Sequence, residues 1–148
     1  MPERTNEEII RAYLSQMGGQ DLEAVGRLRH RDWTCDYPQS GERIRGDAND
    51  RQINEHYPGG LPRIEEGRVV GSEDRWVVTP SYTVERIAGS GATWWVEARV
   101  TYPDGARWFA TTMFRLRDGL IASEVTYWSQ PFEAPDWRAP WVERIPET

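Results

Sequence analysis

Tryptophans and polar side chains alternate in three segments of the second half of this chain. The residues that share a parity within their segment are Trp95 and Glu97; Trp108 and Thr112; and Glu124, Thr126 and Trp128. If these segments are strands, each set points to one face of a sheet. Apolar walls with a few placed polar groups are typical of small-molecule sites. The pattern is therefore compatible with a pocket that binds a small molecule.

Glu97 has the clearest potential chemistry of these residues. A carboxyl among tryptophans is desolvated, which raises its pKa. A glutamate whose pKa is raised towards neutrality can act as a general acid or base. The opposite parity of the same segment, from Trp94 to Val100, is more apolar. The alternative is therefore that Glu97 faces solvent, or pairs with Arg99 or Arg107 on the outer face of the sheet.

Four further side chains, elsewhere in the chain, each have two possible roles. Tyr13 is either a core residue or a donor that stabilises negative charge on a substrate oxygen. His56 is either a proton shuttle or a histidine that ends a helix. Asp36 points away from a pocket that Tyr37 enters, and a shift of one residue would exchange them. Glu124 either forms a surface ion pair or faces the pocket.

Composition and charge exclude several classes of protein. The chain has 148 residues, a net charge of −6 and a pI of about 5.0, which argues against a broad nucleic-acid surface. Cys35 is its single cysteine, so no intrachain disulfide can form, and two histidines make a zinc site unexpected. We expect neither a metal nor another cofactor. The charged first residues and the lack of a long apolar run predict a cytoplasmic protein that does not enter a membrane.

The first half of the chain predicts three helices and a strand. Thr5 and Glu8 have the spacing of a capping box, so the first helix should begin at Asn6. Cys35 reads as a small buried residue of the strand rather than a nucleophile. The other predicted elements are a helix capped by Asp21, the strand over 33–37, and a helix that opens at Gly46-Asp47, carries Ile53, His56 and Tyr57 on its inner stripe and closes at Pro58-Gly59-Gly60.

The second half changes to a period of two residues, which is typical of strands. The predicted strands are 63–72, 75–87, 93–102, 107–116 and 121–129. The last four are separated by short glycine-containing turns, which favours an antiparallel meander. The layout predicts a single α+β domain with its helices on one face of the sheet. An extended tail follows over 131–146, and its Trp137 and Trp141 either cover the pocket mouth or pack on the outside.

Short motifs in this order resemble the nuclear transport factor 2-like superfamily, which includes ketosteroid isomerase, limonene epoxide hydrolase and the SnoaL-like polyketide cyclases. The motifs are Asp32-Trp33-Thr34-Cys35-Asp36-Tyr37-Pro38, the Gly-led third helix, Asp118-Gly119-Leu120-Ile121 and Tyr127-Trp128. The resemblance covers residues 6–130. It implies three N-terminal helices packed in the concave face of a curved antiparallel sheet, a cone-shaped α+β barrel, and a homodimer. The segment from Pro131 to Arg138 looks like the tail of SnoaL-like actinobacterial proteins.

The comparison with ketosteroid isomerase places Tyr13 at the position of the oxyanion-hole tyrosine. Tyr37 falls where that family keeps its aspartate base, and Thr112 where it keeps the aspartic acid of the oxyanion hole. Trp128 matches a pocket tryptophan. One of the three catalytic positions is therefore retained, and the isomerase reaction cannot be transferred as it stands.

The epoxide hydrolase pattern of two aspartates and an arginine is matched less well. Glu97 is near one aspartate position, Trp95 is near the arginine, and Thr126 replaces the other aspartate. The resemblance implies that nine residues face the cavity. They are Tyr13, Tyr37, Trp95, Glu97, Trp108, Thr112, Glu124, Thr126 and Trp128.

Two main hypotheses follow. The first is a cofactor-independent isomerase, cyclase or hydratase that transfers protons on an apolar oxygenated molecule, such as a polyketide or terpenoid. Glu97 would be its acid or base, Tyr13 its oxyanion donor, and the tryptophans its walls. The second is a non-catalytic module that binds a small hydrophobic molecule or another subunit, because Tyr37 and Thr112 replace the expected carboxyl groups. A third is a dimer whose own side chains fill the cavity.

Overall fold

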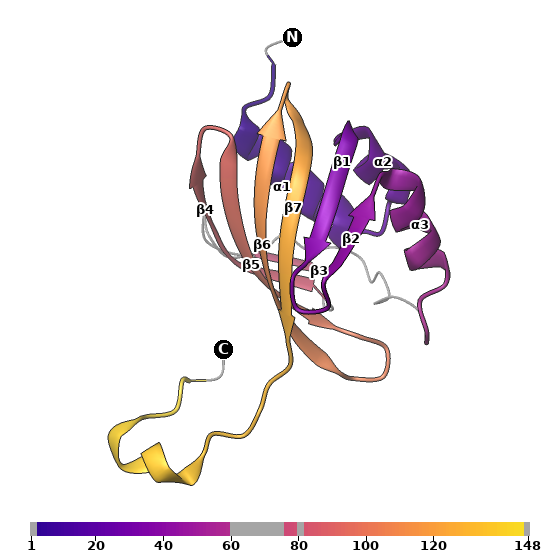
Figure 1. The fold of residues 1–148 in the computed structure, drawn as a ribbon. Coiled ribbons are helices and arrows are strands. Elements are labelled where there is room, and N and C mark those ends of the chain that lie inside the picture. Colours follow the sequence, from indigo (N-terminus) through magenta and orange to yellow (C-terminus); the bar gives the residue numbers. More distant parts are fainter. Residues whose placement is uncertain (1–2, 60–75, 80–81, 147–148) are drawn as a thin grey trace.

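The computed structural model describes residues 3–59, 76–79 and 82–146, which form an α+β fold (Figure 1). The helices in this part of the chain are α1 (Asn6–Gly18), α2 (Leu22–Arg27), α3 (Asp47–Glu55) and a 3₁₀ helix (Asp136–Trp141). The strands are β1 (Arg29–Tyr37), β2 (Glu42–Arg45), β3 (Trp76–Thr79), β4 (Tyr82–Ser90), β5 (Thr93–Thr101), β6 (Arg107–Arg117) and β7 (Leu120–Ser129).

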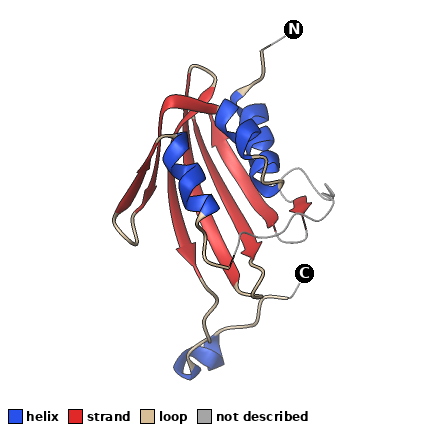
Figure 2. Ribbon diagram, turned by 90° about the vertical axis from the view of Figure 1, so that its right-hand side faces the viewer, coloured by secondary structure: helices blue, strands red, loops and turns tan. Residues whose placement is uncertain are grey.

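The described strands form one sheet in the order β2-β1-β7-β6-β5-β4-β3. From β7 to β3 the neighbours are antiparallel, as the short turns predict. The prediction of a wholly antiparallel sheet is wrong, because β1 and β7 are parallel. The sheet is curved and open, with β2 and β3 at its edges, so it does not close into a barrel (Figure 2).

Most element boundaries follow the sequence patterns, and the differences have local causes. The predicted strand over 75–87 is two strands, β3 and β4, on either side of residues 80–81. β1 begins at Arg29, directly after α2, and β2 is a short edge strand without a clear alternation in sequence. The predicted strand over 63–72 lies outside the described residues.

Helix α1 lies across the concave face of the sheet, because one of its sides is apolar (Figure 2). Its buried residues include Ile10, Tyr13 and Leu14, and they pack with strand residues such as Val96 and Phe114. Fully burying an aliphatic or aromatic side chain of this size stabilises a fold by roughly 1.5–3 kcal/mol. The same packing fixes α1 at one wall of the space between helices and sheet.

The capping box of α1 is formed as predicted. The Thr5 hydroxyl accepts from the Glu8 backbone N–H at 3.2 Å, and the Glu8 carboxylate accepts from the Thr5 N–H at 2.7 Å. Thr5→Ala removes this cap and should lower the free energy of unfolding by about 1 kcal/mol. Thermal unfolding should then shift downwards by roughly 2–4 °C. Thr5→Ser keeps a hydroxyl and should leave the midpoint near wild type; equal loss in both variants would contradict the cap.

Candidate functional site

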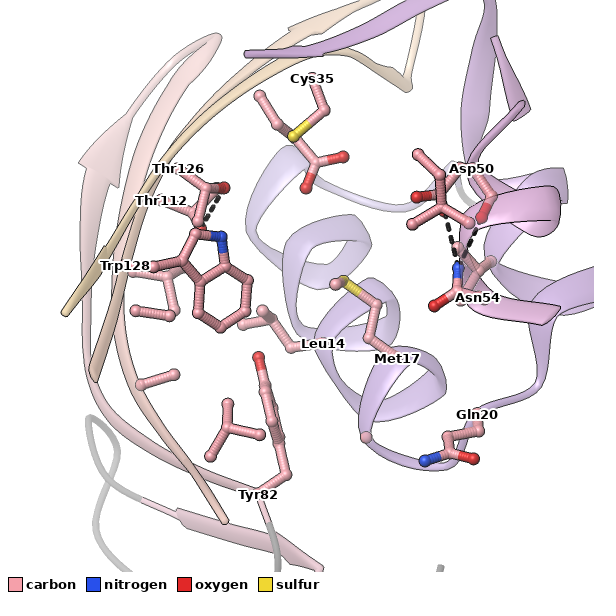
Figure 3. Close-up of a pocket in the computed structure, with 18 of the residues that line it drawn as sticks. Leu14, Met17, Gln20, Cys35, Asp50, Asn54, Tyr82, Thr112, Thr126 and Trp128 are labelled. Carbon is pink, nitrogen blue, oxygen red and sulfur yellow. Dashed lines mark hydrogen bonds between the residues drawn. The ribbon is translucent and has the colours of Figure 1, made fainter. Parts of the chain in front are cut away.

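A cavity of about 450 Å³ lies between the concave face of the sheet and the helices. Figure 3 shows Trp128, Thr126 and Thr112 on the sheet side, Leu14 and Met17 from α1, and Asp50 and Asn54 from α3. Its volume is within the range of roughly 300–1,000 Å³ that small-molecule sites occupy. The cavity is therefore large enough for a ligand of drug-like size.

Much of the cavity wall is aromatic. The rings that contribute to it include Tyr37, Tyr82, Tyr102, Trp108 and Trp128. Tyr37 and Trp128 meet edge to face, with ring centroids 6.4 Å apart. Tyr57, just after α3, stacks on Tyr102 of the sheet side at 5.4 Å. The second contact joins the helical wall to the sheet wall, so it helps to hold the cavity's shape.

Glu124 is the acidic side chain on β7 that lines this cavity, and it is only 4% exposed. Its Oε2 accepts hydrogen bonds from the Tyr13 hydroxyl at 2.7 Å and from the Trp33 indole N–H at 2.6 Å. Oε1 has no hydrogen-bond partner among the described residues. Because no fully buried side-chain polar atom in that part of the chain lacks a partner, Oε1 must be reachable from the cavity.

Arg29 connects Glu124 to α3. Its Nε donates to the Tyr13 hydroxyl at 2.8 Å, and its Nη1 donates to Asp47 at 2.9 Å and to Asp50 at 2.7 Å. The guanidinium also lies over the Trp33 ring, 3.7 Å from the centroid. A continuous chain of hydrogen bonds therefore runs from the aspartates of α3 through Arg29 and Tyr13 to the cavity carboxyl.

The charges in this network balance without Glu124. Asp47 pairs with both Arg29 and Arg51, and Asp50 pairs with Arg29. Two arginines thus compensate two aspartates, and an ionised Glu124 would add a negative charge that no further cation offsets in the described network. Glu124 is consequently placed where its neutral form is favoured.

Burial raises the pKa of Glu124 above its ordinary value of 4.5. The positive charge of Arg29 and the hydrogen bonds from Tyr13 and Trp33 oppose this rise without cancelling it. When the carboxyl is neutral, Tyr13 and Trp33 occupy Oε2, so the proton belongs on Oε1, which faces the cavity. Such a group can give a proton to a ligand and take one back.

Two threonines and a cysteine complete the polar part of the wall near Glu124. The hydroxyls of Thr112 and Thr126 are 2.9 Å apart, so one donates to the other and leaves one proton for a ligand. Burial raises the pKa of the Cys35 thiol, and the nearby Glu124 adds to the effect. Cys35 therefore remains a thiol at neutral pH, which makes it a poor nucleophile.

Six of the residues predicted to bind substrate line the cavity: Tyr37, Trp108, Thr112, Glu124, Thr126 and Trp128. Tyr13 is fully buried behind them, and its hydroxyl is directed to Glu124 rather than to a ligand. Asp36 points away and pairs with Arg43, whose hydrogen bonds lower the pKa of that carboxyl.

The expectation that Trp95 and Glu97 face the cavity is wrong. Val96, Ala98 and Val100 of the same strand line it, so the intervening residues lie on the outer face. The apolar residues of β5 face the helices, because the helices cover that face of the sheet. The suggested pairing of Glu97 with Arg99 is also not formed, since Arg99 pairs with Glu85.

His56 is likewise outside the cavity wall. It is the C-terminal cap of α3, it is exposed, and its Nδ1 lies 2.8 Å from the Gln52 carbonyl oxygen. The interpretation of His56 as a residue that ends the helix therefore describes its position. The prediction that His56 lies on the inner stripe of this helix is wrong.

The sequence did not predict that Arg29, Trp33, Asp47 and Asp50 belong to the site. One signal was present: Arg29 and Trp33 share the parity of Cys35 and Tyr37, so a strand begun four residues earlier would have placed them inside. Within the described residues, no group of three or more histidines, cysteines and carboxylates is arranged to hold a metal. No helix there is both long and apolar enough to cross a membrane.

The chain belongs to the SnoaL-like domain family, whose model matches residues 10–124. The fold is that of the nuclear transport factor 2-like superfamily. The chain is 32% identical to an NTF-2-like protein of unknown function from Burkholderia xenovorans LB400, with 95% of each chain covered and a TM-score of 0.71.

Two further structures carry names that bear on chemistry. A putative ketosteroid isomerase from Kribbella flavida DSM 17836 is 26% identical, with 96% of this chain and 90% of that chain covered and a TM-score of 0.73. An LEH-like epoxide hydrolase from M. tuberculosis is 18% identical over 84% of this chain and 82% of that chain, with a TM-score of 0.56, and shows the fold alone. No curated protein matches the chain.

The link between Tyr13 and Glu124 can be tested by titration. Tyr13→Phe removes a donor to the carboxylate, so the pKa of Glu124 should rise further, because the charged form loses a charge-assisted hydrogen bond. NMR of carboxyl-labelled glutamate would follow this pKa directly. Tyr37→Phe also removes a cavity hydroxyl but none that bonds Glu124, and should leave the pKa in place. Equal shifts in both variants would contradict the link.

The raised pKa of Glu124 also predicts how stability depends on pH. The folded state holds the proton more tightly than the unfolded chain, so this contribution is complete below about pH 4.5 and is lost as pH rises through the folded pKa. The stability of wild type relative to Glu124→Gln should therefore fall as pH rises, as measured by urea unfolding. Asp36→Asn is the control of opposite sign, because the pKa of Asp36 is lowered. A flat difference for Glu124 would refute the assignment.

Proposed function

We propose that this chain binds a small apolar oxygenated molecule, of polyketide or terpenoid character, and transfers protons on it without a cofactor. The observation that carries the proposal is the Glu124 carboxyl at the cavity wall, with Oε2 held by Tyr13 and Trp33 and Oε1 open to a ligand. This differs from the sequence-based assignment, in which Glu97 was the acid or base.

Glu124 can act on a carbonyl compound through Oε1. Its neutral carboxyl gives a proton to the carbonyl oxygen, and the carboxylate then takes a proton from the adjacent carbon. The ligand becomes the enol, and the protein returns to its starting protonation state. Tyr13, Trp33 and Arg29 stabilise the transient carboxylate through the hydrogen bonds and charge already in place.

The shape and chemistry of the cavity favour apolar ligands with one or two oxygens. Its aromatic wall offers large apolar surfaces, while the hydroxyl pair of Thr112 and Thr126 offers a donor near Glu124. The similarity to a putative ketosteroid isomerase, at 26% identity, is in keeping with a carbonyl-containing ligand. We further expect the protein to act in the cytoplasm and as a homodimer.

A second candidate is a binding module of the same fold without catalysis. It is favoured by Tyr37 and Thr112, which line the cavity where the resemblance to ketosteroid isomerase leads one to expect carboxyl groups. The two functions differ in whether a bound ligand exchanges protons with Glu124.

Proton exchange on a bound ketone separates the two candidates. The probe is an apolar cyclic ketone in D₂O, with binding followed by tryptophan fluorescence and α-hydrogen exchange by NMR. Glu124→Gln should keep binding and slow exchange by roughly 10²–10⁴-fold, the usual contribution of a general acid or base. Glu97→Gln, on the outer face, is the matched control and should exchange at the wild-type rate.

Other results would exclude one candidate or both. Binding without exchange in wild type supports the module and contradicts catalysis. Loss of exchange in Glu97→Gln but not in Glu124→Gln would contradict the choice of Glu124. Failure of wild type to bind any apolar oxygenated probe would contradict both candidates.

A further inference from the structure

The segment after β7, residues 130–146, which we call the C-terminal arm, exposes large apolar side chains. Phe132 is 83% exposed, Trp137 74% and Trp141 79%, and Val142 and Ile145 are exposed as well. Single exposed apolar residues are common on protein surfaces, whereas clusters of them mark interaction sites. The arm projects beyond the end of the sheet in both ribbon views (Figures 1 and 2).

A second apolar surface lies on the outer face of the sheet, away from the helices. Trp95, Met113 and Val125 are direct neighbours across β5, β6 and β7. Phe109 and Tyr127 lie on the same face beside them, and both are exposed, as is Met113. We call these five residues the outer-face patch.

Charges on the two surfaces are complementary. Arg107 and Arg115 lie at the two ends of β6 on the outer face, and Glu97 lies between them on the neighbouring strand. None of the three has an ion-pair partner among the described residues. The arm carries three acidic residues, Glu133, Asp136 and Glu143, and two basic ones, Arg138 and Arg144, so its net charge of −1 is opposite in sign to the combined charge of Arg107, Arg115 and Glu97.

The arm and the patch of one chain are badly placed to meet. The arm begins after Ser129, whose neighbour across the sheet is Phe109. It runs past the strand ends and reverses around its 3₁₀ helix without passing over the strands in this view (Figure 1). A second copy can bring its patch to the arm without any rearrangement of the chain. In a two-fold arrangement, two arms would then cover two patches.

The area available is of the size that a stable dimer needs. An aromatic side chain buries roughly 150–250 Å², so the three rings of one arm offer roughly 450–750 Å². Two arms and the two surfaces that receive them together reach the roughly 1,600 Å² of a standard interface.

From these observations we propose that the C-terminal arm packs on the outer-face patch of a second copy of this chain. The proposal is independent of the cavity and its chemistry. It assigns the exposed tryptophans of the arm to an interface between subunits, with Arg107 and Arg115 as partners for its acidic residues.

Sedimentation of full-length variants tests the contribution of the arm. Wild type should be dimeric, and Trp137→Ser combined with Trp141→Ser should raise the dimer dissociation constant at least about tenfold, because buried tryptophans dominate interface energetics. Ile53→Ser removes an exposed apolar side chain from α3, on the cavity side of the molecule, and should leave the dimer dissociation constant unchanged. Circular dichroism would confirm that all variants are folded. A monomeric wild type, or a dimer indifferent to the tryptophan changes, would overturn the proposal.

Cross-linking between two populations tests which surfaces meet. Thr111→Cys marks the patch and Arg138→Cys marks the arm, and a bis-maleimide should join them only when the two proteins are mixed. Wild type, whose Cys35 is buried, is the control and should stay uncross-linked. In a chain carrying Gln20→Cys and Arg138→Cys, cross-linking within that chain would place the arm over its own cavity wall and overturn the proposal. In a chain carrying both Thr111→Cys and Arg138→Cys, cross-linking within that chain would place the arm on its own patch and would also overturn the proposal.

Discussion

The two hydrogen bonds on Oε2 of Glu124 bring together parts of the chain that no local rule places near one another. Tyr13 comes from α1, Trp33 from β1 and Glu124 from β7. A carboxyl this deeply buried is costly unless donors meet it. The donors in turn are fixed by Arg29, which reaches α3 through Asp47 and Asp50. The hydrogen bonds that form the site therefore also join α1 and α3 to the sheet.

The parts of the fold that depend on neighbouring residues could be predicted from the sequence. The capping box at Thr5 fixes the start of α1, and short glycine turns set the antiparallel order from β4 to β7. The parallel pairing of β1 with β7 could not be predicted in this way, because it joins residues far apart in the chain. The edge strand β2 is too short for its alternation to be recognised.

The candidate site shows the same division. Alternation placed Thr112, Thr126 and Trp128 on one face, and they do line the cavity. Alternation could not decide which residues of β5 face inward, since Trp94 and Trp95 stand on opposite faces. The sequence therefore predicted Glu97 as the cavity carboxyl, whereas the carboxyl on the cavity wall is that of Glu124. Arg29 went unnoticed because arginine is rarely buried unless it is paired, and its partners on α3 are visible only in three dimensions.

The parallel pairing of β1 with β7 has a consequence for how the protein is made. β1 ends at Tyr37 and β7 begins at Leu120, so a growing chain contains β1 long before its partner is synthesised. Until then β1 has only the four residues of β2 beside it, and β6 has an open edge, both of which are templates for pairing with other chains. Contacts between such distant segments also slow folding. The last strand therefore acts as the closing step of the sheet, and a nascent chain halted before residue 120 should depend on chaperones to avoid aggregation.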